Sequence, residues 1–274
     1  MPSPDDLVRT LAPQLEAAAR EAGDIALGYF RHGQTTSARV WSKSGGSPVT
    51  EADVSVDAFL KIRLSGILPQ AGWLSEETVD SPSRLGKRLV WIVDPIDGTR
   101  AFLSGHPDWS VAIALLVDDR PLMGIVHAPH LDTLFSATRG GGAALNGEPI
   151  SVSPAAGLRG SRVAGPKPLI DTLRRRAGEI VQVDRIPSLA LRLARIASGE
   201  VDIGLVTGNA RDWDIAAADL ILAEAGGVLT DFSGEHPRYN RSEPLHGELL
   251  AASRALHPHV LEAMTAQWRP ERVL

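Results

Sequence analysis

Hydrophobic residues recur every three or four positions near the N-terminus, a spacing that predicts an amphipathic helix from about residue 7 to residue 29. A polar, glycine-containing segment at 41–48 is expected to form a loop. Thr50 then stands where a helix N-cap is expected, and the second helix that it predicts carries Asp53 and Asp57. The positions that share the apolar face of the first helix are Leu7, Leu11, Leu15, Ala18, Ala22, Ile25 and Tyr29.

After Gly72, short apolar runs replace the spacing of three or four residues that is typical of helices. Residues 89–93 are expected to form a buried strand that ends at an acidic turn. Residues 109–117 and 122–128 are rich in β-branched and apolar side chains, and the four residues at 118–121 predict a hairpin turn between them. A further strand is expected at 131–137.

The second half of the chain alternates between helices and strands, which indicates α/β layering. We therefore expect a boundary near residue 150, between an N-terminal α+β subdomain over 1–150 and a C-terminal α/β subdomain over 151–274. The expected elements of the second half are helices at 189–196 and 213–225 and strands at 201–206, 228–230 and 249–252.

Composition narrows the class of protein. With 43% hydrophobic and 22% charged residues among 274, the chain is typical of globular proteins. Its net charge of −5 argues against a protein that binds many phosphates of a nucleic acid. The absence of cysteine excludes disulfides, zinc–thiolate sites and thiol nucleophiles. The acidic N-terminus is unlike a signal peptide and no apolar run reaches bilayer length, so we expect a cytoplasmic protein without a membrane partner.

Candidate chemistry is concentrated in one short segment. Asp94 and Asp97 lie three positions apart, and Gly98-Thr99 follows where a helix could begin. Carboxylates suit a hard divalent cation, and the backbone N–H groups of a helix start suit phosphate. This juxtaposition predicts phosphate-ester chemistry.

Three other acidic sites stand at similar positions, namely Asp53, Glu76-Glu77 and Asp214. Each has an ordinary structural explanation: an aspartate before a helix is commonly an N-cap, and a Glu pair is commonly a solvated turn. Taken together they predict a metal site, because two Mg²⁺ ions about 3.5–4 Å apart can stabilise both oxygens of a phosphoryl displacement.

The longest motifs resemble a known family. Asp94-Pro95-Ile96-Asp97-Gly98-Thr99 and Trp213-Asp214-Ile215-Ala216-Ala217 are similar to the two signatures of the inositol monophosphatase family, and the resemblance runs from about residue 7 to residue 252. It implies a layered αβαβα sandwich of the inositol monophosphatase / sugar phosphatase type. One departure is Ser75, which stands before Glu76-Glu77 where the family usually has glycine.

The resemblance also implies roles for individual residues. Two Mg²⁺ ions, with a third held more weakly through Glu76, would bind mainly to ligands from the first subdomain, and Asp214 would come from the second. Thr99, aided by Asp53, would activate the attacking water, while the backbone N–H groups of Gly98 and Thr99 would cradle the phosphate. The implied metal ligands are Glu76, Asp94, the carbonyl of Ile96, Asp97 and Asp214.

The resemblance extends to a branch of the family. Inositol-preferring members carry a glutamate where this chain has Thr207, and the run from Asp94 to Leu116 looks closer to the bacterial 3′(2′),5′-bisphosphate nucleotidases. The implied substrate is adenosine 3′,5′-bisphosphate. Lys167 and Arg211 are candidates for contacts to the second phosphate, and Ser188 is a candidate near the ribose.

Other functions stay open at this point. Within the phosphatases, the alternatives are an inositol-1-phosphate or broad sugar-phosphate phosphatase and a histidinol-phosphate phosphatase, which has a related Gly-Thr-Arg-x-Phe-x-Ser-Gly run. Outside them, a regulatory binding protein that acts on transcription complexes is a further alternative. The branch implies inhibition by Li⁺, and relatives are commonly homodimers.

Overall fold

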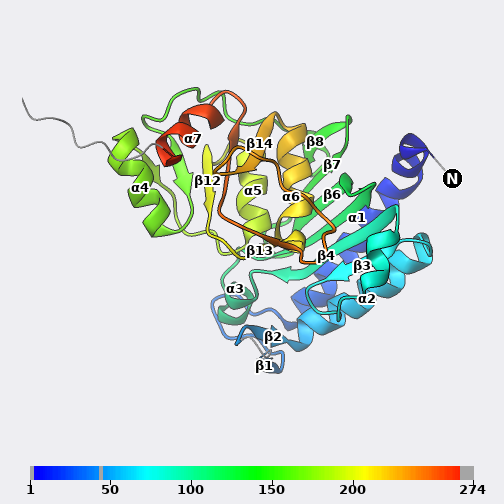
Figure 1. Cartoon of the computed structure of the whole chain (residues 1–274). Coiled ribbons are helices and arrows are strands. Elements are labelled where there is room, and N and C mark those ends of the chain that lie inside the picture. The colour runs from blue at the N-terminus through cyan, green and yellow to red at the C-terminus, as the bar shows by residue number, and fades with distance from the viewer. Residues whose placement is uncertain (1–2, 43–45, 266–274) are drawn as a thin grey trace, which may run out of the picture.

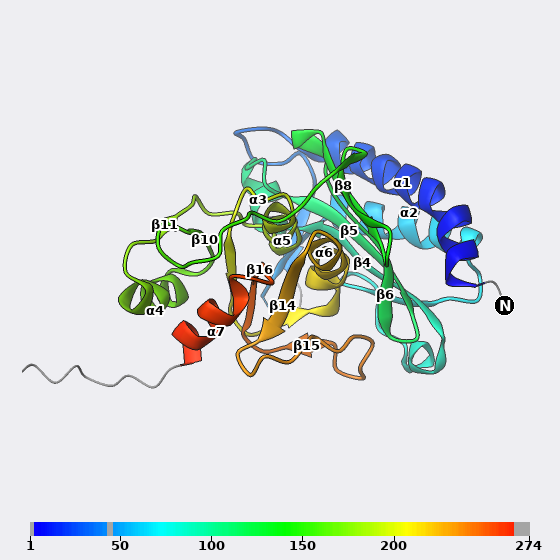
Figure 2. The ribbon, with the colours of Figure 1, turned by 90° about the horizontal axis from the view of Figure 1, so that it is seen from above.

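The computed structural model describes residues 3–42 and 46–265. Its elements form five layers in the order helices, sheet, helices, sheet, helices, as Figures 1 and 2 show from two directions. The expected αβαβα layering is therefore confirmed. The middle of the predicted loop at 41–48 lies outside the described residues.

The larger sheet has seven strands whose spatial order follows the chain. Only its first pair, β3 with β4, is parallel among the pairs formed by described residues. Helices α1 (Pro4–Tyr29) and α2 (Glu51–Ile67) pack on its outer face. The strands are β3 (Gly72–Ser75), β4 (Leu89–Asp97), β5 (Ser110–Val117), β6 (Arg120–Ala128), β7 (Thr133–Thr138), β8 (Gly142–Leu145) and β9 (Glu148–Pro149).

The smaller sheet has five strands in the order β11-β10-β12-β16-β14. Helices α5 (Leu189–Ala197) and α6 (Asp212–Glu224) lie between the two sheets, and α4 (Lys167–Ala177) and α7 (His257–Thr265) form the last layer (Figure 2). Its strands are β10 (Arg162–Ala164), β11 (Val181–Gln182), β12 (Ile203–Val206), β14 (Gly227–Asp231) and β16 (Leu249–Ser253).

Short elements connect these layers. They are the paired strands β1 (Val40–Ser42) with β2 (Pro48–Thr50) and β13 (Ala210–Arg211) with β15 (Leu245–His246), the helix α3 (Thr99–Ser104), and the 3₁₀ turns η1 (Pro82–Gly86) and η2 (Pro129–Leu131).

The two N-terminal helices form as their sequence patterns predict. In α1 the apolar positions spaced by three and four are buried, except Ile25 and Tyr29, which are partly buried. Ser3 caps the first turn by accepting from the N–H of Asp6. In α2 the predicted cap is confirmed, since Thr50 accepts from the N–H of Asp53 while the Asp53 side chain accepts from the N–H of Thr50. This reciprocal cap fixes Asp53 at the start of the helix.

The acidic segment is part of a strand, which corrects the sequence-based prediction. We expected the strand to end at residue 93, before an acidic turn, but β4 continues through Asp97 and stays paired with β5. Its register shifts between Asp94 and Asp97, which indicates a bulge. Pro95 fits there because a bulge tolerates a residue without an N–H. The hairpin turn is also shorter than predicted: β6 begins at Arg120, immediately after two residues with positive φ.

Several short elements were not predicted from the sequence. β10 and β11 have three and two residues, too few for a period of two to be recognised. Their pairing partners come from distant parts of the chain, because β10 lies beside both β11 and β12. Tertiary contacts define these strands more than local sequence does.

The core joins both halves of the chain. One apolar cluster includes Val126 of β6, Leu193 of α5 and Ile221 of α6. Gly124 lets α6 approach the large sheet, since a Cβ there would lie 2.6 Å from the carbonyl oxygen of Ala217. The chain passes from the larger sheet to the smaller sheet between residues 149 and 162, near the subdomain boundary that we predict. Within residues 3–42 and 46–265, helices long and apolar enough to span a bilayer are absent.

Candidate active site

Three carboxylates from two elements meet at the C-terminal end of strand β4 in the large sheet. Oxygen atoms of Asp94, Asp97 and Asp214 all lie within 4.8 Å of one another. Asp94 and Asp97 come from the bulged end of β4, and Asp214 is the third residue of α6. Asp214 is held there because its Oδ2 accepts from the N–H of Arg211 at 2.6 Å. We call this group the carboxylate cluster.

The surroundings of the carboxylate cluster favour a positively charged ligand. Desolvation raises the pKa of Asp94 and that of Asp214 well above their ordinary value, and the neighbouring carboxylates raise both further. Burial raises the pKa of Asp97 to about 6. Like charges so close in a buried site repel one another unless a cation or a proton compensates them. The donor set, oxygen atoms alone, fits a hard divalent cation such as Mg²⁺.

The N-terminus of α5 fixes the orientation of Asp97. Its Oδ2 accepts from the hydroxyl of Ser188 at 2.5 Å and from the N–H of Ala190 at 2.7 Å. Ser188 also caps α5, because its Oγ accepts from the N–H of Leu191 at 3.0 Å. Ser188 was expected near a ribose, but it is completely buried and its hydroxyl is bonded to Asp97. The structure thus gives Ser188 a positioning role at this carboxylate.

A second group of polar side chains lies beside the carboxylate cluster. Oδ2 of Asp53 accepts from the hydroxyl of Thr50 at 2.6 Å and from its N–H at 2.8 Å. The hydroxyl of Thr99 lies 3.3 Å from the other oxygen of Asp53 and 3.1 Å from the carbonyl oxygen of Ile96. Burial raises the pKa of Asp53 to about 6, opposed by its hydrogen bonds from Thr50. A carboxylate with this pKa can accept a proton near neutral pH.

Gly98 gives the backbone its direction into α3. Its φ of +92° is in the left-handed region, and a Cβ would lie 3.3 Å from the carbonyl oxygen of Asp108 and from backbone atoms of Ser188. Another residue would therefore strain the turn and crowd the start of α5. The turn leads directly into α3, and both Gly98 and Thr99 line the pocket described next.

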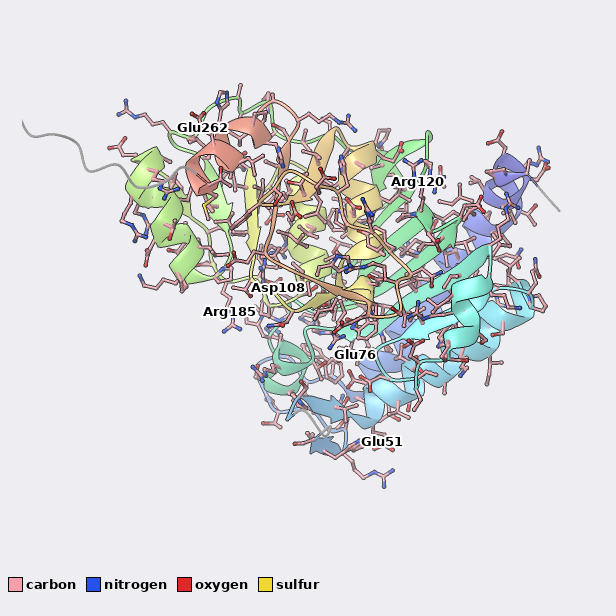
Figure 3. All side chains as sticks on the ribbon, in the orientation of Figure 1. Glu51, Glu76, Asp108, Arg120, Arg185 and Glu262 are labelled. Atoms are coloured by element: carbon pink, nitrogen blue, oxygen red, sulfur yellow. The ribbon has the colours of Figure 1, made fainter. Side chains whose placement is uncertain are left out.

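The carboxylate cluster, Gly98 and Thr99 open into a common pocket of about 240 Å³, whose described lining does not include Asp53. Figure 3 labels Glu76 and Arg185, which both line it, along the edge where the two halves of the chain meet. Ile96 itself is fully buried, with its carbonyl oxygen accepting from Thr99. The predicted site residues that line this pocket are Glu76, Asp94, Asp97, Gly98, Thr99 and Asp214.

A larger pocket of about 610 Å³ adjoins the first and shares Asp214 and Arg185 with it. Its lining includes three cations, Lys167, Arg185 and Arg192, and we call it the cationic pocket. The guanidinium of Arg192 is partly buried and donates to the carbonyl oxygen of Ile186 at 2.9 Å. Lys167 is ion-paired with Asp171 at 2.8 Å.

The predicted contact residues therefore differ in their placement. Lys167 lies in the cationic pocket, whereas the described residues that line the two pockets do not include Arg211. The guanidinium of Arg211 lies 6.0 Å from the ring centroid of Trp213, and its backbone N–H bonds to Asp214. Sequence reasoning missed Arg185 and Arg192. The only signal for Arg192 is its position four residues after Ser188, one turn along the same helix face.

Comparisons with known proteins point to one family. The chain matches the model of the inositol monophosphatase family over residues 7–269. It is 33% identical to a histidinol-phosphatase from Chlorobaculum parvum, over 93% of this chain and 97% of that protein. It is also 33% identical to the Nus factor SuhB of Escherichia coli K12, over 93% and 94%. An inositol monophosphatase structure from Thermotoga maritima superposes with a TM-score of 0.78 at 28% identity, over 90% of this chain and 94% of that one.

Proposed function

The chain belongs to the inositol monophosphatase family, whose members are metal-dependent phosphatases, and we propose that it removes the 3′-phosphate from adenosine 3′,5′-bisphosphate. The observation that carries the proposal is the charge of the cationic pocket. Among the described residues, three cationic side chains line it, of which Lys167 is ion-paired with Asp171, and the carboxylate that lines it, Asp214, belongs to the carboxylate cluster. A leaving group that carries its own phosphate matches this balance of charge.

The carboxylate cluster, with Glu76 and the carbonyl of Ile96, would hold two to three Mg²⁺ ions. Such ions, when bound, lower the pKa of water and neutralise charge on the phosphoryl oxygens. The N–H groups of Gly98 and Thr99 at the pocket are suited to orient the phosphate.

The chain's own residues supply the proton transfer. The hydroxyl of Thr99 lies between the Asp53 carboxylate and the Ile96 carbonyl, so it can orient a water and pass a proton to Asp53. Thr50 and the cap of α2 keep Asp53 in place during that transfer. No covalent intermediate on the protein is required.

Two other substrates follow from the names of relatives. Histidinol phosphate, suggested by the Chlorobaculum parvum protein, carries an ammonium group and an imidazole and would place positive charge against Arg185 and Lys167. Inositol-1-phosphate offers neutral hydroxyls to a pocket in which Thr207 stands where inositol-preferring members carry a glutamate. Both substrates match the cationic pocket less well than a bisphosphate does.

The Escherichia coli relative raises a non-enzymatic alternative, because it is a Nus factor. The arrangement of Asp53, Thr99 and the carboxylate cluster favours catalysis, since a purely structural role would not require three mutually repelling carboxylates at one pocket. We include inhibition by Li⁺, a homodimer and a cytoplasmic location in the proposal.

The test is phosphate release from adenosine 3′,5′-bisphosphate, inositol-1-phosphate and histidinol phosphate, each with Mg²⁺ and with EDTA. We expect the bisphosphate to give the highest kcat/KM, and EDTA to abolish all release. Adenosine 5′-monophosphate is the matched control, because it lacks the 3′-phosphate. A higher kcat/KM for histidinol phosphate or inositol-1-phosphate would overturn the substrate assignment while leaving the phosphatase chemistry intact.

A further inference from the structure

A buried carboxylate outside the two pockets holds the loop that carries Glu76. Asp57 lies one helical turn after Asp53 on α2 and is only 7% exposed. Its Oδ1 accepts from the hydroxyl of Ser75, and its Oδ2 accepts from the hydroxyl of Thr78 at 2.6 Å. The two oxygens of one carboxylate thus bind the chain on both sides of the Glu76-Glu77 step.

Regular strand structure ends just before Glu76, so side-chain contacts help to set the path of the loop. β3 ends at Ser75, and the N–H of Glu76 bonds to the carbonyl of Val93 with a distance of 3.3 Å. The Ser75 hydroxyl, 2% exposed as a residue, also accepts from the N–H of Glu77 at 3.5 Å. Glu76 therefore leaves the sheet at a point where the hydroxyls on either side of it are tied to α2.

Glu76 is the fourth carboxylate of the pocket that contains the carboxylate cluster. Asp94, Asp97 and Asp214 are positioned by a strand and a helix, whereas Glu76 stands on a loop. Ser75 matters here because its hydroxyl is the group that donates to Asp57, a contact that a residue without a hydroxyl could not make.

We propose that Asp57, through Ser75 and Thr78, is a positioning residue that fixes the Glu76 carboxylate for metal binding. We call these three residues the loop clamp. The inference rests on the metal-binding part of the proposed function and is independent of which phosphate ester is cleaved. Groups that orient a metal ligand commonly change metal affinity by about 10–100-fold when they are removed.

The test compares Mg²⁺ affinity, measured by isothermal titration, in the wild type and in Asp57→Ala. Mn²⁺ binding followed by electron paramagnetic resonance gives a second readout that needs no turnover. We expect Asp57→Ala to weaken Mg²⁺ binding about tenfold, with kcat at saturating Mg²⁺ within about twofold of the wild type.

Two variants separate positioning from general stability. Asp57→Asn should restore most of the affinity, because the hydroxyls of Ser75 and Thr78 can accept from its amide as well as donate to it. Ser55→Ala is the matched control: its hydroxyl donates to the Glu51 carbonyl within α2, so its loss should leave Mg²⁺ affinity unchanged. Ser75→Ala should weaken affinity in the wild type and have a smaller effect in Asp57→Ala, because the contact between the Ser75 hydroxyl and Asp57 is already lost there.

Wild-type Mg²⁺ affinity in both Asp57→Ala and Ser75→Ala would overturn the loop clamp, even if the melting temperature fell. If Asp57→Ala does not fold, Ser75→Ala and Thr78→Val decide the question by the same titration. A wild type that binds no Mg²⁺ would overturn the metal centre together with the loop clamp. A wild type that binds Mg²⁺ with an unaffected Asp57→Ala would overturn the loop clamp alone.

Discussion

The carboxylate cluster and the cationic pocket share Asp214 but are built in different ways. The cluster comes from the end of β4 and the first turn of α6, and its carboxylates are held by backbone N–H groups and buried hydroxyls. The cationic pocket is lined by side chains from α4, α5 and the loops around them, and Arg185 is exposed. The carboxylates are thus fixed in part by the main chain, whereas the cationic pocket includes an exposed side chain that can adapt. Under the proposed function, the fixed groups carry the reaction and the adaptable ones select the substrate.

The largest expected effect comes from a substitution in the carboxylate cluster. Asp97→Asn removes one negative charge but keeps an acceptor for Ser188 and Ala190. We expect phosphate release at saturating Mg²⁺ to fall by about 1,000-fold or more, equivalent to about 4 kcal/mol of lost transition-state stabilisation.

Circular dichroism and the melting temperature without metal provide the control for this variant. The fold should persist, and the melting temperature should be equal or higher, because the neutral amide introduced by the substitution does not repel the carboxylates of Asp94 and Asp214. Normal turnover in Asp97→Asn would contradict the metal assignment.

Thr99→Ala tests the proton path beside the carboxylate cluster. Loss of the hydroxyl between Asp53 and the Ile96 carbonyl should reduce kcat by about 100-fold, the range of general acid–base catalysis. Thr99→Ser should recover most of the rate, because it retains the hydroxyl. Rates of Thr99→Ala and Thr99→Ser that match each other would argue against this role.

Arg185→Ala tests the cationic pocket and should have a smaller effect. Loss of one charge-assisted contact in a site open to solvent is expected to raise KM for adenosine 3′,5′-bisphosphate by about tenfold, with kcat little changed. KM for a substrate without a second anionic group should not rise. An equal rise for both substrates would mean that Arg185 does not recognise the second phosphate.

The smallest expected effect concerns a partly buried carboxylate that belongs to neither region. Burial raises the pKa of Asp219 to about 6, opposed by a hydrogen bond from Tyr239. A folded-state pKa above the unfolded value of 3.8 means that this group contributes stability below about pH 4, and that the contribution is lost as pH rises through 6.

Asp219→Asn should therefore stabilise the protein at pH 8 and leave it unchanged near pH 4. Solvent reaches part of this side chain, so we expect about 1 kcal/mol at pH 8 from urea unfolding. A gain of the same size at pH 4 would show that charge burial is not the cause.

The features that the sequence predicted share one property, which is proximity along the chain. Asp94, Asp97 and Thr99 lie within six residues, and Thr50 caps the helix that carries Asp53 only three positions later. Local spacing was enough to suggest their chemistry. The α/β layering of the second half was predictable from the alternation of helices such as α6 with strands, whereas the αβαβα order of the layers was implied by the resemblance to the family.

The features that it did not predict depend on contacts between distant segments. Ser188 bonds to Asp97 across 91 positions, so a cap of α5 becomes a support for a carboxylate. Arg185 reaches the pockets from a loop between β11 and α5, where no periodic pattern exists. The loop clamp joins α2 to the residues around the end of β3 through the hydroxyls of Ser75 and Thr78. In the sequence alone, nothing distinguishes these two residues from other polar residues.

The central claim is that Asp94, Asp97 and Asp214 converge to bind divalent cations. Isothermal titration of Mg²⁺ into the wild type and into Asp214→Asn tests it most directly. We expect at least two bound ions in the wild type and the loss of one or more in Asp214→Asn, with the fold intact by circular dichroism. Equal Mg²⁺ binding by both proteins, or no binding by the wild type, would contradict it.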